Sequence, residues 1–503
     1  MARVSLRLRW LALLLSLGVL AVFLDVQLTW RAIYASKRVF RRTIQALTKV
    51  AQSTSEESQL VQTLNQLAQN TSQSRGLVIP VYEPTIKLAA SLVLELRTMG
   101  VDWPVEMPHC GDLTVESQEL MLQKPALGSI RLYDVCERAA STNVANSAKK
   151  LFCADLDACH LKFRAFEIKI LAVVYSLFEE VMMIDADTTF FVNPTVLWDS
   201  DKYQSTGTLL MNDRISHDIY WMAERVGGDP EISVQREYLA NFDVAPFHSL
   251  PTIARGKASL ANMSPVMLNF EPSDFLLSSH SWNLRSGHQV DSSLVLWNKK
   301  RQPRATAILA SFMALNDVAS PPSYGDKELY FYAAELAETQ YSVSDHAIGA
   351  VGTDFRDYGE KNSTLCGDMA QVFPLQPTNE SDDVPLFYLN SDRILYFRPV
   401  EEPVYYMKAR PAEFYPGAFG ERRMECPFGI SVGKLSQAEE EHLSGRQRLH
   451  QITVEWEEAA RLSKDDPTRR KEMDAATDGK LDVLMHEMRD TYRRNVATRR
   501  GDV

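Results

Sequence analysis

The stretch "VMMIDADTTFFVNP" (181–194) places two aspartates between two apolar segments. Apolar residues lead directly into Asp185-Ala186-Asp187, as they do where a buried strand ends. Burying unpaired charge is costly, so a cation, a set of hydrogen-bond donors or open solvent must meet the carboxylates. Residues i and i+2 of an extended segment point the same way, and Ala186 is too small to keep them apart. The pattern therefore predicts a site for Mn²⁺ or Mg²⁺, which can bind a diphosphate; an exposed acidic turn is the alternative.

Strand and helix patterns alternate around this stretch. "GLVIPVY" (76–82) indicates a strand, "TIKLAASLVLELRTMG" (85–100) a helix that ends at Gly100, and "PVEMPHC" (104–110) a second strand. This order predicts βαβ units and a mostly parallel sheet, in which ligands bind outside the carboxyl ends of the strands. Further predicted elements are a helix at 164–180 that leads into a strand at 181–184, strands at 206–211 and 292–297, and a helix at 327–338.

The N-terminus indicates a membrane anchor. Arginines precede the apolar run 10–24, which is shorter than the ~20 residues of a typical spanning helix and is lengthened by including residues up to Trp30. No clean cleavage site follows Leu24, which favours a signal anchor over a cleaved signal peptide, although basic residues on the far side weaken the orientation argument. The predicted parts are a cytoplasmic tail at 1–9, the anchor at 10–30, a Gln- and Ser-rich stem at 31–75, a lumenal domain at 76–434 and a charged helical extension at 435–503.

Other features independently favour the secretory route. The six cysteines include no C-x-x-C pair, so at least two disulfides are predicted rather than a zinc site. Cys153–Cys159 is the simplest pair by spacing, and the other pairings stay open. The net charge of −11 argues against a nucleic-acid partner, because phosphate binding needs a basic surface. Acceptor triplets for N-glycans occur at Asn70, Asn262, Asn362 and Asn379.

Four stretches together carry a resemblance. "SLFEEVMMIDADTTFFVNPTVLWD" (176–199) resembles the donor-binding segment of the fungal α-1,3-mannosyltransferase family, which are type II membrane enzymes of the Golgi. "GLVIPV" (76–81) and its helix are similar to the opening βα unit of that family. "GHQVDSSLVLWNKK" (287–300) resembles its Gln/Glu-x-Asp-Ser-Gly strand with a trailing lysine, and "GDKELYFYAAELA" (325–337) its Gly-Asp-Lys-Glu helix start.

The resemblance implies an A-type glycosyltransferase fold for the lumenal domain, with GDP-mannose as donor and Mn²⁺ (or Mg²⁺) as cofactor. Asp185 and Asp187 would bind the metal and the donor, and Asp291 would be the catalytic carboxylate near the transferred sugar. The resemblance also implies that three further residues line the same cleft: Asp326, Lys327 and Glu328. Helix capping explains the two acids among them about as well as catalysis does.

Two departures from the family pattern leave roles open. Ser293 stands where the family tends to have glycine, which puts close backbone approach in doubt. The late segment "LFYLNSDRILYFRPV" (386–400) contains no histidine where the family usually supplies one, so a third metal ligand is unassigned and His346 is a candidate. Arg214 could contact phosphate, with a salt bridge to Asp213 as the simpler alternative.

The expected reaction is transfer of mannose from GDP-mannose to a mannose-terminated glycan of a glycoprotein in the Golgi, forming an α-1,3 linkage. Because the donor sugar is α-linked, an α-mannoside product means retention of configuration. The alternatives are the same fold acting on a UDP-hexose, and a non-catalytic lumenal partner of a glycosyltransferase complex. A non-catalytic partner has no need of Asp185 and Asp187. After residue 434 the charge-dense sequence predicts helices, with disorder of the last ~30 residues as the alternative.

Overall fold

The computed structural model describes residues 54–214, 221–227, 231–315, 321–356, 363–375, 384–397, 402–408, 430–462 and 467–501. The predicted anchor at 10–30 and the cytoplasmic tail lie outside these ranges. Among the described residues no helix is both long and apolar enough to cross a membrane. The chain divides into two units, Met1–Leu60 and Val61–Val503, and the second contains both sheets and the site.

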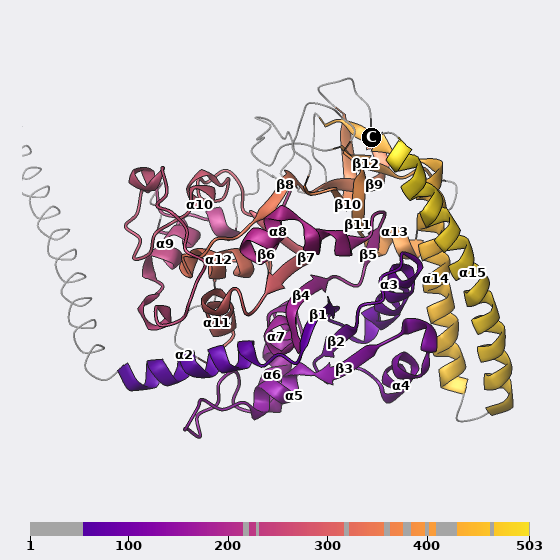
Figure 1. Ribbon diagram of the computed structural model, residues 1–503, viewed down its shortest axis with the longest axis horizontal. Coiled ribbons are helices and arrows are strands. Elements are labelled where there is room, and N and C mark those ends of the chain that lie inside the picture. Colours follow the sequence, from indigo (N-terminus) through magenta and orange to yellow (C-terminus); the bar gives the residue numbers. More distant parts are fainter. Residues whose placement is uncertain are drawn as a thin grey trace, which may run out of the picture. The chain divides into compact units, whose positions relative to one another are not determined.

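A seven-stranded sheet in the order β3-β2-β1-β4-β7-β6-β8 carries the site (Figure 1). Only β7 runs antiparallel to its neighbours, and the other pairings are parallel. The predicted α/β class with a mostly parallel sheet is therefore confirmed. The strands are β1 (Gln73–Val78), β2 (Val105–His109), β3 (Ile130–Asp134), β4 (Phe178–Ile184), β6 (Thr208–Asn212), β7 (Val290–Asn298) and β8 (Val343–Ala347).

The predicted strands and helices of this sheet are present, with shifted ends. The helix before β4 ends at Tyr175, so β4 begins at Phe178 rather than at Val181. Gly100 ends α3 with a φ of +82°, a conformation that glycine adopts at little cost. The helices of this part are α3 (Ile86–Thr98), α4 (Val115–Gln123), α5 (Val135–Ser141), α6 (Leu156–Phe163), α7 (Ile168–Tyr175), α8 (Asp201–Thr206), α9 (Val234–Asn241), α10 (Asp274–Ser278), α11 (Pro303–Ser311) and α12 (Leu329–Leu336).

A second, six-stranded sheet is antiparallel throughout, in the order β13-β12-β9-β10-β11-β5. The sequence did not predict it, because most of its strands pair with partners far along the chain. Asp185-Ala186-Asp187 joins β4 of the first sheet to β5 of the second, so the acidic motif lies where the two sheets meet. The strands are β5 (Thr188–Phe190), β9 (Gly349–Arg356), β10 (Thr364–Val372), β11 (Leu386–Asn390), β12 (Tyr405–Met407) and β13 (Val432–Lys434).

Two long C-terminal helices, α14 (Gln437–Leu462) and α15 (Pro467–Gly501), lie side by side, and both contact α3 (Figure 1). The last residues, whose order the sequence left open, are helical up to Gly501. Leu449, Ile452 and Trp456 of α14 are buried, because their spacing places them on one face of the helix. The short helix α13 (Asp392–Phe397) also contacts α14.

The end of the predicted stem belongs to the folded unit. Helix α2 (Thr54–Gln69) has Leu64 and Ala68 fully buried, and β1 begins before Gly76. Helical spacing gathers the few apolar residues of this polar stretch on one face, which is enough for packing. The sequons at Asn70 and Asn262 are exposed, and those at Asn362 and Asn379 lie outside the described residues.

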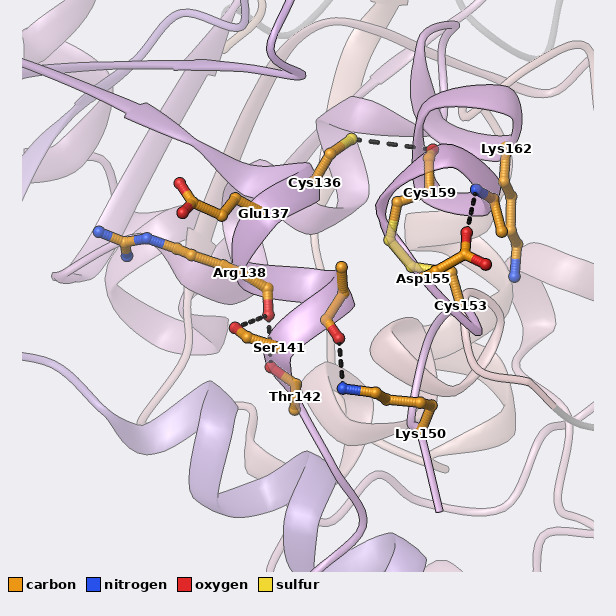
Figure 2. The surroundings of a disulfide bond; sticks show 12 residues. Cys136, Glu137, Arg138, Ser141, Thr142, Lys150, Cys153, Asp155, Cys159 and Lys162 are labelled. Atoms are coloured by element: carbon orange, nitrogen blue, oxygen red, sulfur yellow. Dashed lines mark hydrogen bonds between the residues drawn. A yellow bond between two sulfur atoms is a disulfide. The ribbon is translucent and has the colours of Figure 1, made fainter. Parts of the chain in front are cut away.

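Two disulfides, Cys110–Cys136 and Cys153–Cys159, confirm the prediction of at least two. Figure 2 shows Cys136 pointing toward Cys159, whose carbonyl oxygen lies 3.8 Å from the Cys136 sulfur. No described cysteine is free to bind zinc. The Arg164 side chain, just after α6, donates to the carbonyl of Cys110 at 3.0 Å. The disulfides therefore hold the segment that leads into α7 and the site.

Candidate active site

The two aspartates line a cavity of about 440 Å³. Burial raises the pKa of Asp185, and burial together with the neighbouring Asp185 charge raises the pKa of Asp187 to about 7. The predicted convergence of the carboxylates on one open site is therefore found. A cation bound between the two buried carboxylates would stabilise their ionised forms, because it would offset the free energy that burial of the charges costs.

Lys169 of α7 is the nearest cation to this pair, and the sequence did not single it out. Its Nζ lies 2.7 Å from Asp185 Oδ1 and 3.5 Å from Asp326 Oδ1. Burial alone would lower the pKa of Lys169, but the two carboxylates outweigh it and raise that pKa. Lys169 lies inside the apolar run "IKILAVVY", and this position could have predicted an acidic partner, because a buried lysine needs one.

The C-terminal end of β11 and the residue after it hold Asp187. Asn390 Nδ2 donates to Asp187 Oδ1 at 2.8 Å, and the Ser391 backbone N–H donates to the Asp187 carbonyl at 3.1 Å. Asp392 lines the same cavity. The family pattern usually has a histidine here, whereas Asn390 and Asp392 repeat the pattern of two polar residues, i and i+2, at the end of a buried strand. That pattern was the missed signal.

A second group of charges surrounds Lys327. Its Nζ lies 3.0 Å from Asp213 Oδ2 and 3.2 Å from Asp291 Oδ2. Burial would raise the pKa of Asp291, but Lys327 and hydrogen bonds from Ser293 hold that pKa below its usual value. The Ser293 hydroxyl also contacts Asp291 and lies 2.8 Å from the Tyr388 hydroxyl. Ser293, in place of glycine, therefore orients an ionised Asp291.

Arg214 is buried, and its Nε and Nη1 have no hydrogen-bond partner among the described residues. Its charge acts on Lys327, which places it beside the second group. The simpler alternative, a salt bridge from Arg214 to Asp213, is not found there, because Asp213 is paired with Lys327. An unsatisfied buried guanidinium suits an anionic ligand.

The two acids near α12 are not helix caps. Glu328 is the N-cap residue, yet its side chain makes no capping bond. Its carboxylate instead accepts from the Ser323 hydroxyl at 2.5 Å and lies 3.5 Å from His288 Nδ1, out of contact with the cavity lining. Burial raises the pKa of Asp326 to about 6. Of this predicted set, the structure brings Asp326 and Lys327 to the charged groups and places Glu328 behind them.

The structure does not bring His346 to the cavity. It is fully buried on β8 and is not among the residues that line the cavity. Within the described ranges, no group of three His, Cys, Asp or Glu side chains is placed to hold a metal ion. Two carboxylates on one cavity still fit a hard divalent cation that takes its other ligands from a diphosphate and water.

We refer to Asp185, Asp187, Asp213, Asp291 and Asp326 as the carboxylate cluster. The cations beside it are Lys169, Lys327 and Arg214, so five carboxylates face three cations when all are charged. The arrangement can therefore bind a cation at the open end while its closed end is neutralised by lysines.

A second network, formed by Glu95, His442 and Arg446, supports the acidic motif from behind. Glu95 Oε1 lies 2.8 Å from His442 Nε2, and its Oε2 lies 3.2 Å from Arg446 Nε. Arg446 Nη2 donates to the backbone carbonyls of Ala186 and Thr188 at 3.4 and 3.5 Å. The C-terminal helix α14 thus holds the chain on both sides of Asp187. Nothing in the local sequence around Arg446 indicated this role.

Comparison with known sequences identifies the family. The family described as "Mannosyltransferase putative" matches residues 74–372. The chain belongs to this mannosyltransferase family. The match contains both members of the acidic motif and Asp291, which confirms the resemblance drawn from the four sequence stretches. Asn390 and Arg446 lie beyond the matched residues of this family member.

Individual relatives are distant. The chain is 23% identical over 295 residues to "Putative alpha-1,3-mannosyltransferase MNN14" of Candida albicans, which covers 58% of this chain and 37% of the relative. It is 25% identical over 277 residues to "Alpha-1,3-mannosyltransferase MNT3" of Saccharomyces cerevisiae, which covers 54% and 39%. The chain therefore spans less than two-fifths of the length of these relatives.

Among solved structures, "WbbM bifunctional glycosytransferase apo structure" is similar with a TM-score of 0.30 and 10% identity. That match covers 55% of this chain and 39% of the other chain. A likeness at this level carries no argument.

Proposed function

We propose that this mannosyltransferase family member transfers mannose from GDP-mannose to a mannose-terminated glycan of a glycoprotein, forming an α-1,3 linkage with retention. The proposal includes an A-type glycosyltransferase fold and a type II anchor that holds the domain in the Golgi lumen. One observation carries it: in a chain of this family, Asp185 and Asp187 line one cavity, and burial together with the Asp185 charge raises the pKa of Asp187. The names of the relatives support the linkage.

The proposed cofactor is Mn²⁺ or Mg²⁺, held by Asp185 and Asp187. Bound there, the ion would neutralise charge on the departing diphosphate. Asn390 fixes Asp187 and Lys169 fixes Asp185, so the carboxylates are held in place before the donor binds. The unsatisfied buried nitrogens of Arg214 support a proposed contact with phosphate oxygens.

In the transfer, the acceptor hydroxyl oxygen forms a bond to C1 of mannose, and the bond between C1 and the GDP oxygen breaks. The electron pair of that bond leaves with GDP, and the hydroxyl proton passes to the departing phosphate. The sugar carries positive charge as the bond breaks, and the ionised Asp291 is the carboxylate proposed to stabilise it. Ser293 and Lys327 keep Asp291 charged and oriented for this role.

The test uses the full-length protein in detergent with Mn²⁺ and a panel of GDP-mannose, UDP-glucose and UDP-galactose. Release of the nucleotide and transfer to a mannoside acceptor are measured for each donor. We expect GDP-mannose to be used, with product linkage α-1,3 by NMR. Preference for a UDP-hexose would overturn the donor assignment. Absence of turnover and of nucleotide binding for every donor would favour the non-catalytic partner.

A further inference from the structure

Three partly exposed aromatic side chains from separate segments meet near the carboxylate cluster. The Tyr324 ring centroid lies 5.1 Å from that of Trp221 and 5.9 Å from that of Phe166. Tyr324, Trp221 and Phe166 remain 43%, 42% and 52% exposed. Large aromatic side chains gain much from burial, so three that touch one another at the surface mark a binding area. We refer to these three residues as the aromatic patch.

The aromatic patch borders the proposed place of transfer. Phe166 also lines the cavity that contains Asp185 and Asp187. The Tyr324 ring centroid lies 6.0 Å from Lys327 Nζ, which is paired with Asp291. The patch therefore borders both the cavity of Asp185 and Asp187 and the pair of Lys327 with Asp291.

Glycine at position 325 permits this arrangement. Gly325 has a φ of +66°, and a Cβ added there would lie 2.8 Å from Phe166 side-chain atoms. Any other residue would push the Phe166 ring away from the chain beside Tyr324. The Gly325-Asp326-Lys327 turn thus places one aromatic ring of the patch and two charged groups of the site together.

We propose that the aromatic patch binds the acceptor sugar, with the C–H face of a hexopyranose lying on Tyr324 and Trp221. This inference rests on the proposed function, whose acceptor subsite it names. The C–H groups on one face of a pyranose are weakly positive and match the negative face of an aromatic ring. Sugar sites combine such apolar contacts with a few polar groups, which Asp291 and Lys327 supply beside the patch.

The patch fits the acceptor better than the nucleoside of the donor. The donor cavity has its own wall from residues 80–82, directly after β1, where open α/β sheets bind ligands. Tyr324 of the patch lies beside Lys327, which is paired with Asp291, and only Phe166 of the patch lines the donor cavity. Stacking of the guanine base on the patch is the competing outcome of the test.

The test measures binding of methyl α-mannoside to the full-length protein by saturation-transfer NMR, with GDP and Mn²⁺ present, and the KM values for acceptor and donor. The variants are Tyr324→Ala and Trp221→Asn, since Asn tolerates the positive φ of Trp221. Tyr324→Phe keeps the ring, and Leu161→Ala, at an exposed apolar residue of α6, is the matched control. Thermal unfolding confirms that each variant is folded.

We expect the acceptor KM to rise roughly two- to tenfold in Tyr324→Ala and in Trp221→Asn, with the saturation-transfer signal weakened and the donor KM unchanged. Tyr324→Phe and Leu161→Ala should match the wild type. The inference would be overturned if the acceptor KM stayed unchanged in both folded variants, or if only the donor KM rose. The proposed function would still hold in that case, because the wild type transfers mannose. A wild type that binds the mannoside but transfers no mannose, with variants that lose this binding, would overturn only the proposed function.

Discussion

The carboxylate cluster and the Glu95 network bury acidic side chains on opposite sides of the same Asp185–Asp187 connection, with opposite results. In the cluster, carboxylates outnumber cations, burial raises the pKa of Asp187 and Asp326, and the group opens into a cavity. In the network, Glu95 has no exposed side-chain surface and is paired with Arg446 and His442. Buried charge that is left uncompensated serves binding, whereas buried charge that is matched and sealed serves stability.

The largest effect is expected from removing charge in the cluster. Asp185→Asn and Asp187→Asn should each reduce mannose transfer by roughly 100-fold or more, because each removes a proposed metal ligand. The melting temperature without ligand should fall in Asp185→Asn, which removes the ion-pair partner of buried Lys169, and should stay unchanged or rise in Asp187→Asn, since the two carboxylates repel each other. Stabilisation by GDP with Mn²⁺ should be lost, as thermal unfolding will show. Asp345→Asn, at an ion pair with Lys202, is the control.

A variant of the acidic motif that keeps full activity would contradict the role given to the cluster. A variant that unfolds much more easily, with activity retained, would mean that the aspartates serve the fold, as the Glu95 network does.

The next effect is expected in the Glu95 network. Arg446→Gln leaves Glu95 buried without its guanidinium partner and should cost about 3 kcal/mol of unfolding free energy, measured by chemical denaturation. The double variant Glu95→Leu with Arg446→Leu should recover much of that loss, because a whole buried pair is replaced by apolar groups. Arg448→Gln, at an exposed pair two residues along α14, should change stability by less than about 1 kcal/mol.

The same double variant separates positioning from stability. It lacks the donors to the Ala186 and Thr188 carbonyls, so Mn²⁺ and GDP affinity should remain reduced after stability returns. Recovery of both stability and affinity would show that Arg446 does not position the motif.

The smallest effect is a pH dependence on the same side of the molecule. Burial, together with the Arg446 charge, lowers the pKa of His450 to about 4. The unfolded chain then binds a proton more readily than the folded one, so stability is lost as pH falls from about 6.5 toward 4. The loss from this group should reach about 2 kcal/mol at pH 5. His450→Gln should remove it, so denaturation curves at pH 7 and pH 5 should differ less in the variant. An unchanged pH difference would contradict the assignment.

The sequence by itself determined the parts that depend on neighbours along the chain. The apolar run of β4 and the i, i+2 spacing of Asp185 and Asp187 are local, so the strand and the convergence of its two carboxylates could be predicted. The alternation of predicted strands and helices likewise indicated the mostly parallel sheet. Helix periodicity did not predict where α7 ends, and the start of β4 was therefore predicted too late in the sequence. The family resemblance added Asp291 and Asp326, which the structure brings to the same cluster.

Only the tertiary structure decided which groups meet those carboxylates. Asn390 is separated from Asp187 by 203 residues, and Arg446 from Ala186 by 260, so no local pattern could pair them. Glu95 lies in a helix whose charged residues would ordinarily face water, yet α14 covers that face and buries it. A charged side chain acquires its role from the partner that desolvates it, and long-range packing selects that partner.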